Sequence, residues 1–472
     1  MAEMKAPGVY VVEQDGRADA VEEVPTAVPA FIGHTAKADH GGEPLLYKPW
    51  RISSMAEYRE HFGAEPTPRF DLKAVPPGCN VESTFTVEEQ DYYVEQVSGA
   101  EGRAFLLYRC MESFFLNGGG ACYVVCVGDY ETPVEAQQLI AGIHALEGEH
   151  EPTMVVIPDA VLLSHAQCMD VQRASLMHCG QMASRIALLD VHGGYADRSV
   201  PSDDPIAQFR NALGTDHLDY GVAYYPWLHM SIVGDGDLGV RNVRNRELLG
   251  LDGAAEVADD ALAAASPAFA SILPEMKRQL NLLPPSAAIA GVYAMVDSSR
   301  GVWKAPANVA LNGVVAPAVA LSHEDQEDLN VTPQGKSINA IRAFVGEGVL
   351  VWGARTLDGN SNDWKYVNVR RTLIMLEESI KRASGPYVRA ENDASTWVCL
   401  KNAIRGFLTS IWQRGGLAGA TEDDAFSVHI GLGETMTPED LVEGVLRVTV
   451  LVAVSRPAEF IEITFQQRMA RP

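Results

Sequence analysis

The sequence has 472 residues, of which 47% are apolar and 21% are charged. This composition is typical of a folded globular protein and excludes a largely disordered chain, and the length predicts two or three domains. Asp and Glu outnumber Lys and Arg by 62 to 37, so the formal net charge is −25. Such an acidic chain is repelled by phosphate backbones and by anionic lipid, so neither nucleic acid nor a membrane surface is an expected partner.

The cysteines and the first residues predict the compartment in which the chain folds. Seven cysteines, an odd number, do not indicate a disulfide framework. The closest pair, Cys122 and Cys126, would lie too far apart on a strand for a disulfide or a shared metal, so we expect small buried core residues. The first ten residues lack the apolar core of a signal peptide. Residues 445–454, the most apolar late run, are too few to span a bilayer. We therefore expect synthesis and folding in the cytoplasm.

Residues 1–30 are predicted to form an extended N-terminal arm. Its strand-forming residues are Val9, Tyr10, Val11 and Val12. Residues 30–33 follow as a first core strand, and residues 53–63 are predicted to form a short helix. Residues 64–102 are rich in proline and acidic side chains. We interpret them as an inserted, surface-facing excursion.

From residue 103 to about residue 331, helical and strand periods alternate, which predicts an α/β fold. The candidate buried strands are residues 123–127, 154–157, 186–190 and 221–225. An alanine-rich helix is expected over residues 286–296. We predict a multidomain α/β (α+β) protein with a central α/β domain at 31–330, a smaller C-terminal α/β domain at 331–455, and β-prone arms at 1–30 and 456–472.

The C-terminal part has the clearest helical patterns. A helix is predicted to start after Asn362 and Asp363, and a second one to be capped at Asn392 or Asp393. Both bury apolar residues at spacings of three and four. The first set is Tyr366, Val369, Leu373, Leu376 and Ile380, and the second is Trp397, Leu400, Ile404, Phe407 and Ile411.

Strands are expected on both sides of these helices. A strand pair is predicted at residues 338–344 and 349–353, and further strands at residues 425–430 and 444–454. A last alternating stretch, residues 460–465, comes after Pro457 and supplies a β-prone segment to the C-terminal arm. Its apolar residues are Phe460, Ile461, Ile463 and Phe465.

Three motifs could be taken for catalytic or phosphate-binding sites. Residues 117–120, Asn-Gly-Gly-Gly, follow a predicted helix and precede a strand, the reverse of a phosphate-binding turn, so Gly118 is interpreted as a left-handed helix stop. Residues 335–337, Gly-Lys-Ser, lack the first glycine of a P-loop. The best enzyme-like set is Asp190, His192 and His229, which follow predicted strands at an edge where ligands bind in α/β sheets. No nucleophile-elbow Ser or Cys accompanies them, and no metal or cofactor motif is present.

Several stretches together resemble the contractile tail sheath family of phages and phage-tail-like injection systems. They are APGVYVVEQ, VPTAVPAFIGHT, KPWRISSMAEYREHFG, FFLNGGGACYVVCVG, GVWKAPANVALNGV, GEGVLVWGARTL, YVNVRRTLIMLEESIKRA and RPAEFIEITFQQ. The matches run in order from residue 6 to residue 467. The exception is the excursion at 64–102, which resembles nothing known to us.

The resemblance implies a structural subunit and not an enzyme. Copies would stack as rings around an inner tube, with baseplate and cap proteins at the ends, and would contract to drive the tube through a target envelope. The subunit would be made in the cytoplasm and become part of a phage tail or a tail-like particle that can leave the cell. The two β-prone arms would add strands to a neighbour's sheet. The alternative is an α/β enzyme that uses a crevice near Asp190, His192 and His229.

The two C-terminal helices also carry a local excess of basic residues. Residues 361–416 hold nine Lys and Arg against five Asp and Glu. One interpretation is a pair of solvated helix faces with i,i+4 ion pairs. The other is a surface that contacts acidic groups on the tube or on an adjacent subunit. For this second interpretation, the expected contacts are Arg370, Arg371, Lys401 and Arg405, which should face outward.

Overall fold

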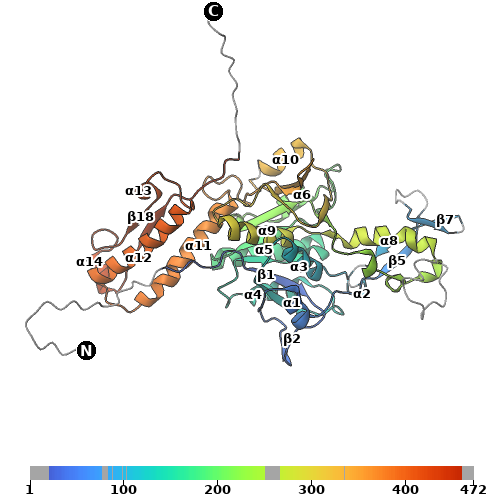
Figure 1. Ribbon diagram of the computed structural model, residues 1–472, viewed down its shortest axis with the longest axis horizontal. Helices are drawn as coiled ribbons and strands as arrows, with labels where there is room; N and C mark the ends of the chain where they lie inside the picture. Colours follow the sequence, from blue (N-terminus) through green and yellow to red (C-terminus); the bar gives the residue numbers. More distant parts are fainter. Residues whose placement is uncertain are drawn as a thin grey trace, which may run out of the picture. The chain divides into compact units, whose positions relative to one another are not determined.

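The computed structural model describes residues 21–76, 83–87, 89–97, 99–102, 104–249, 266–333 and 335–459. It divides into two compact units (Figure 1). The main unit comprises Pro25–Ile374 and Arg456–Pro472, and the C-terminal unit comprises Met1–Val24 and Met375–Ser455. The chain therefore passes between the units after Val24, after Ile374 and after Ser455.

The main unit is built on a sheet that has nine strands among the described residues. In spatial order they are β14 (Val309–Ala310), β17 (Gly348–Val351), β16 (Asn339–Phe344), β11 (Gly221–Tyr225), β10 (Ile186–Asp190), β9 (Met154–Val156), β1 (Pro29–His34), β8 (Cys122–Gly128) and β4 (Trp50–Ile52). The strands from β16 to β8 pair in parallel, and antiparallel strands close both edges. Strands β1, β10 and β11 are buried along their whole length, as expected for parallel strands covered on both faces.

Helices cover both faces of this sheet. One face packs against α1 (Met55–Phe62), α3 (Leu107–Leu116) and α9 (Ser286–Arg300), and the other against α4 (Ala136–His144), α5 (His165–Met182) and α6 (Pro205–Ala212). Alternate residues of β1 serve the two cores, with Phe31 in the first and Ala30 and Ile32 in the second. The predicted α/β class, the strands at 123–127, 154–157, 186–190 and 221–225, and the helices at 53–63 and 286–296 are confirmed.

The excursion at residues 64–102 forms half of a small subdomain. Its strands β5 (Phe70–Ala74), β6 (Phe85–Val87) and β7 (Gln90–Gln96) make an antiparallel sheet in the order β5-β7-β6. The other half comprises residues 233–249 and α8 (Pro267–Leu280), whose Phe269, Ile272 and Met276 pack against Phe70 and Val94. Sequence periodicity identified only the first of these two segments.

The remaining elements of the main unit are short. They are β2 (Asp39–His40), β3 (Glu43–Pro44), α2 (Gly99–Gly102), β12 (Leu228–Met230), β13 (Leu282–Leu283), β15 (Val314–Pro317), α10 (His323–Asn330) and the 3-10 turns Pro158–Leu162, Leu218–Tyr220, Asp235–Asp237, Val240–Asn242 and Arg246–Leu249. Strands β12, β13 and β15 form a sheet of their own.

The C-terminal unit starts within α11 (Val367–Ser384). It continues through the 3-10 turn Gly385–Tyr387, α12 (Ala394–Gln413), α13 (Glu422–Ala425), β18 (Phe426–His429), α14 (Pro438–Val442) and β19 (Thr449–Val452). The Asp393 side chain accepts from Thr396 N at 3.0 Å, so the predicted cap of α12 is confirmed. The stripe of that helix is confirmed for Leu400, Ile404, Phe407 and Ile411, which are buried.

Three sequence-based boundaries were wrong. Strands β16 and β17 lie where the strand pair was predicted, but they extend the central sheet by pairing β16 with β11 and do not belong to the C-terminal unit. Helix α11 begins at Val367, several residues after Asp363, because Tyr366 still forms a β-bridge with Arg355. The strand expected at 444–454 is limited to β19, since residue 444 lies in a turn and residues 445–448 have no regular secondary structure.

Candidate assembly surface

The expected arm residues lie outside the described residues of the structure. They are Val9, Tyr10, Val11 and Val12 at one end and Phe460, Ile461, Ile463 and Phe465 at the other. The structure describes the segments that border the two arms and the sheet in the C-terminal unit that could receive such a strand.

The β18–β19 sheet has a free edge along β19. Its two strands pair antiparallel, with Phe426 opposite Val452 and His429 opposite Thr449. Ala453 N donates to the carbonyl of Ala425 at 2.8 Å, so residue 453 directs its polar backbone groups toward β18. Backbone groups alternate sides along a strand, so those of Val450 and Val452 point away from β18. Among the described residues, none forms a hydrogen bond with these outward groups.

The chain beyond β19 leaves the same edge free. Ala418 N donates to Ala453 O at 2.7 Å, and Ser455 N donates to Gly416 O at 3.4 Å, so residues 416–418 continue the line of β18 past the turn that holds α13. Residues 449–455 are all half-buried or exposed, and the Leu451 side chain is 59% exposed. In the part of the chain that the structure describes, the outer edge of β19 is therefore open to an incoming strand.

Natural proteins usually protect an edge strand of this kind with charge, proline or a bulge. Strand β19 reads Thr-Val-Leu-Val, without charge or proline, and its nearest charged neighbours along the chain are Arg447 and Arg456. The guanidinium of Arg447 is already bonded to Asp440 at 2.9 Å. The sequence signal that could have identified this edge is an uncharged β-branched run between two arginines.

Arg370 does not face outward, which corrects the prediction for this residue. It is 5% exposed and lies between two aromatic rings, 4.3 Å from the centroid of Tyr220 and 3.6 Å from that of Trp364. Its guanidinium forms an ion pair with Asp219. All of these groups belong to the main unit. Arg370 thus fixes the first turn of α11 within its own subunit.

Arg371 is buried as well, at 3% exposure. Its guanidinium bonds both carboxylate oxygens of Asp297, at 3.0 and 2.5 Å, and the carbonyl of Thr26 at 2.9 Å, and it lies 4.6 Å from the ring centroid of Tyr293. On a helical wheel Arg371 is opposite the apolar stripe, so the sequence gives no sign of this burial. It arises because α9 and the segment at Thr26 cover the second face of α11.

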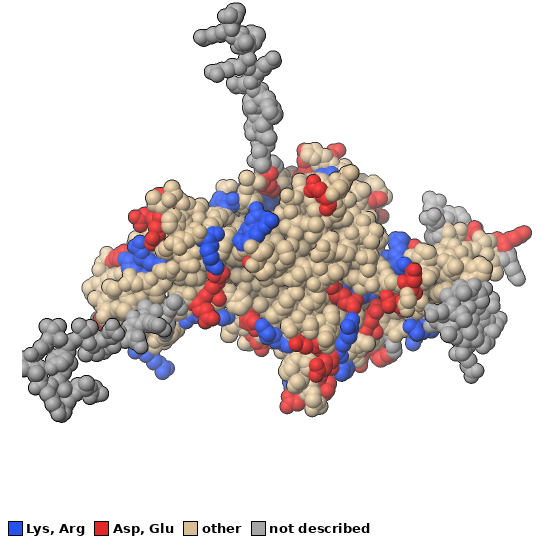
Figure 2. All heavy atoms as spheres, viewed as in Figure 1, with Lys and Arg blue, Asp and Glu red and all other residues tan. Residues whose placement is uncertain are grey.

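Lys401 and Arg405 on α12 are partly exposed, as expected. Lys401 Nζ lies 3.7 Å from Glu434, and Arg405 donates to Glu422 at 2.9 Å. Their side chains remain 30% and 45% exposed. Exposed pairs contribute only about 0.2–1 kcal/mol, so these two cations can exchange partners at little cost. On the face shown in Figure 2, Lys and Arg lie interspersed with Asp and Glu and form no continuous basic patch.

The enzyme-like residues are engaged separately and do not form a catalytic group. Asp190 is buried at the end of β10, where its carboxylate accepts from the backbone N and the Oγ of Ser286 at 2.9 and 2.5 Å. Burial raises its pKa to about 7, although the Ser286 hydrogen bonds oppose the shift. His192 contacts the carbonyl of Leu163 at 3.0 Å. His229 lies on β12, where burial and the charge of Arg278 lower its pKa.

Asp190 therefore holds the start of α9, and among the described residues no hydrogen bond or ion pair joins it to either histidine. The glycine stop is confirmed, since Gly118 follows α3 with φ of +96°. In the described part of the chain no group of three or more His, Cys, Asp or Glu could hold a metal ion. No described helix is long and apolar enough to cross a membrane.

Comparison with known proteins identifies the family. The family model of the phage tail sheath protein central domain matches residues 132–357, and that of the phage tail sheath C-terminal domain matches residues 360–468. The tail sheath protein of Burkholderia phage BcepMu is 30% identical over 144 residues, which are 29% of this chain and 30% of that relative. The chain thus spans under a third of this curated relative's length.

Two solved structures resemble the chain over almost its full length. The sheath of an extracellular contractile injection system, PVC, in the contracted state has 29% identity and a TM-score of 0.64, covering 99% of both chains. The helical sheath of the anti-feeding prophage (AFP) in the contracted state has 28% identity and a TM-score of 0.65, covering 99% of this chain and 100% of that one. Together with the two domain matches, this likeness shows that the chain belongs to the phage tail sheath protein family.

Proposed function

We propose that this chain is the sheath subunit of a contractile injection system or phage tail. In this function, copies polymerise as stacked rings around an inner tube and contract to drive the tube through a target envelope. The observation that carries the proposal is the likeness to contracted sheaths across 99% of the chain at 28–29% identity. A likeness of this extent involves both units and not a shared domain alone.

The β-prone arms are the proposed connectors between copies. A two-stranded sheet is marginally stable by itself in water, and the free edge of β19 offers backbone groups that a third strand would satisfy. The residues proposed to supply such strands are Val9, Tyr10, Val11 and Val12 at one end and Phe460, Ile461, Ile463 and Phe465 at the other. A contact of this heterologous type produces open helical arrays and not closed dimers.

The other partners and the setting follow from the same proposal. The subunit would bind an inner tube protein and meet baseplate and cap proteins at the ends of the cylinder, without nucleic acid, cofactor or catalysis. It would be made in the cytoplasm and act within a phage tail or a tail-like particle that can be released. The AFP baseplate structure, which also resembles this chain at 28% identity over 99% of its length, supports the baseplate contact.

Negative-stain microscopy of the purified chain tests the proposed function. We expect hollow cylinders or stacked rings, because each copy offers both a donor segment and an acceptor edge. The same preparation should yield longer cylinders at higher protein concentration, as for an open array. A small soluble oligomer at every concentration would contradict the proposal and would favour the enzyme alternative.

The positive charges on α12 are proposed to contact acidic groups on the tube or on an adjacent subunit. With Arg370 and Arg371 buried, the proposal is restricted to Lys401 and Arg405. Screened contacts of this kind hold an extended sheath while permitting release, since each contributes about 0.2–1 kcal/mol and a ring of copies adds them. A dry apolar contact would instead favour a single packed arrangement.

Reversing both charges, Lys401→Glu with Arg405→Glu, should reduce the fraction of extended, tube-filled particles and increase the contracted or empty ones. Raised salt should move the wild-type protein in the same direction, because exposed charges are screened. Electron microscopy counts of the three particle types measure the effect. The control is Lys381→Glu, which removes the ion pair of a 70% exposed lysine with Glu378 on α11. Wild-type particle proportions in the double variant would show that the two charges serve only as a solvated face.

A further inference from the structure

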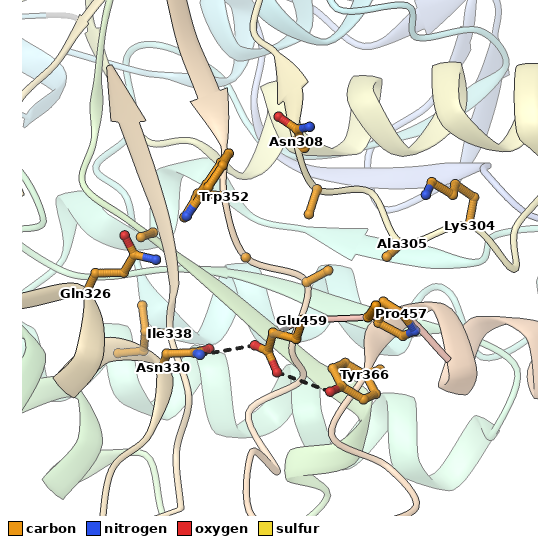
Figure 3. A pocket seen from close by; sticks show the side chains of 15 residues that line it. Lys304, Ala305, Asn308, Gln326, Asn330, Ile338, Trp352, Tyr366, Pro457 and Glu459 are labelled. Atoms are coloured by element: carbon orange, nitrogen blue, oxygen red, sulfur yellow. Dashed lines mark hydrogen bonds between the residues drawn. The ribbon is translucent and has the colours of Figure 1, made fainter. Parts of the chain in front are cut away.

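The last described residue of the chain, Glu459, is held by a set of polar contacts in the main unit. Its carboxylate accepts from Arg355 Nε at 2.8 Å and from Arg355 Nη2 at 2.6 Å. It also accepts from Asn330 Nδ2 and from the Tyr366 hydroxyl, both at 3.1 Å (Figure 3). We call Arg355, Glu459, Asn330 and Tyr366 the arm clamp. These four residues come from separate segments of one compact unit.

Arg355 is held in position by contacts that do not involve Glu459. Its backbone N donates to the Asn339 side chain at 2.7 Å, and its carbonyl accepts from the same side chain at 2.8 Å. Its third guanidinium nitrogen donates to the Asn330 carbonyl at 2.9 Å. The Arg355 side chain is only 6% exposed and that of Glu459 is 22% exposed. A bidentate pair on an immobilised, shielded arginine is among the stronger polar contacts in proteins.

The pair stays charged at neutral and mildly acidic pH. Burial acts to raise the pKa of Glu459, but hydrogen bonds from Arg355 and Asn330 and the guanidinium charge outweigh it, so the pKa is lowered. A carboxyl whose pKa is lower in the folded state contributes stability above its ordinary value of about 4.3 and loses it as the pH falls through the lowered value. The clamp is therefore closed under ordinary conditions.

Packing contributes little to the hold on this segment. Pro457, Ala458 and Glu459 border a cavity of about 400 Å³, whose other walls include Trp352 and Lys304 (Figure 3). Ala458 is exposed and Pro457 is half-buried. The neighbouring ion pair of Arg456 with Asp363 is long, at 3.6 Å, and both side chains are more than half exposed. The Glu459 contacts are thus the strong attachment between Ser455 and the start of the C-terminal arm.

The inner end of the N-terminal arm is attached in a similar way. The carbonyl of Thr26 accepts from Arg371 at 2.9 Å and from the Thr153 hydroxyl at 2.7 Å, while the Thr26 hydroxyl donates to Asp297 at 2.6 Å. A buried arginine of the main unit therefore holds the chain next to each arm. Two unrelated segments with the same kind of attachment favour a common mechanical role.

We propose that the arm clamp is the fixed point from which residues 460–472 reach a neighbouring copy, and that Arg355 and Glu459 are its positioning residues. Load on the arm then passes directly to the central sheet of the main unit. Without the clamp the arm would start at Ser455, and the four freed residues would add up to about 14 Å of slack. A slack connector lets one subunit move without moving the next. The clamp itself does not depend on the proposed function. Only the statement that the arm reaches a neighbouring copy rests on that function.

The test compares Glu459→Gln with Arg456→Gln. The first removes the ion pair but keeps the shape of the side chain, and the second removes the weak pair three residues earlier in the same segment. On the unassembled full-length chain, limited proteolysis followed by intact-mass analysis should release the C-terminal segment about tenfold faster in Glu459→Gln, since charge-assisted hydrogen bonds are lost. Arg456→Gln should behave like wild type in cleavage and in thermal melting, whereas Glu459→Gln should melt below wild type, because it leaves the shielded Arg355 without its charged partner.

A second measurement examines assembled cylinders of the same variants. Cylinders of Glu459→Gln should contract incompletely, leaving mixed extended and contracted stretches, whereas those of Arg456→Gln should contract like wild type. Equal cleavage rates in Glu459→Gln and wild type would overturn the clamp itself. Complete contraction of Glu459→Gln cylinders would overturn its role in carrying load. Failure of the wild-type chain to form cylinders would instead contradict the proposed function, and the cleavage result would still stand.

Discussion

Deleting residues 460–472 should leave a folded chain that forms no cylinders. Truncation after Glu459 keeps the arm clamp and every contact described for the two units, so the melting temperature of the unassembled chain should change little. The deletion removes the proposed donor strand, which by its length reaches at most about 45 Å from the clamp. Each copy then keeps only the N-terminal arm as a donor, and we expect one connector per copy to be too few to hold a cylinder together.

Circular dichroism melting and negative-stain microscopy measure the two halves of this prediction. The matched control is a chain that lacks only residues 466–472 and keeps the alternating segment at 460–465. This control should still assemble, because the apolar residues that alternate along a strand are intact. Normal cylinders from the chain that ends at Glu459 would show that the body of the subunit, and not its arm, holds the polymer together.

Blocking the free edge of β19 should abolish assembly from the acceptor side. In Val452→Pro, the ring removes an N–H group that points away from β18, so the internal ladder of the sheet is kept. An incoming strand would lose a hydrogen bond worth about 1 kcal/mol and would also meet the proline ring. Every copy in the array carries the same defect, so we expect about tenfold fewer cylinders or none.

Two neighbouring substitutions separate an edge effect from a loss of fold. Val452→Ala keeps the outward N–H and should assemble, although its smaller side chain fits Phe426 less well. Leu451→Pro removes an N–H directed at β18 and should lower the melting temperature of the unassembled chain before any question of assembly arises. Particle counts of the three variants measure the edge effect, and their melting curves measure the loss of fold. Wild-type assembly by Val452→Pro would place the arm contact elsewhere.

The local sequence pattern was sufficient to predict an element wherever the residues of that segment alone determine its structure. The parallel strands could be predicted because runs such as residues 186–190 and 221–225 are almost continuously apolar. This pattern is typical of strands whose sheet is covered on both faces. Helix α12 was found because its stripe and its Asp393 cap are encoded within about twenty residues. The family resemblance likewise rests on short ordered stretches that need no contacts to be recognised.

Contacts between distant segments decided the rest. The described part of the excursion at 64–102 packs against residues 233–249 and α8, which lie far along the chain, and β16 joins the central sheet by pairing with β11. A helical wheel shows which face of α11 is apolar. It cannot show that Asp219 and Asp297, from two other segments, neutralise Arg370 and Arg371. The sequence by itself thus determined the elements and their family. The tertiary structure decided which charges are buried and which edge is free, because burial depends on what packs against the second face of a helix and a free edge depends on which segments pair beside a strand.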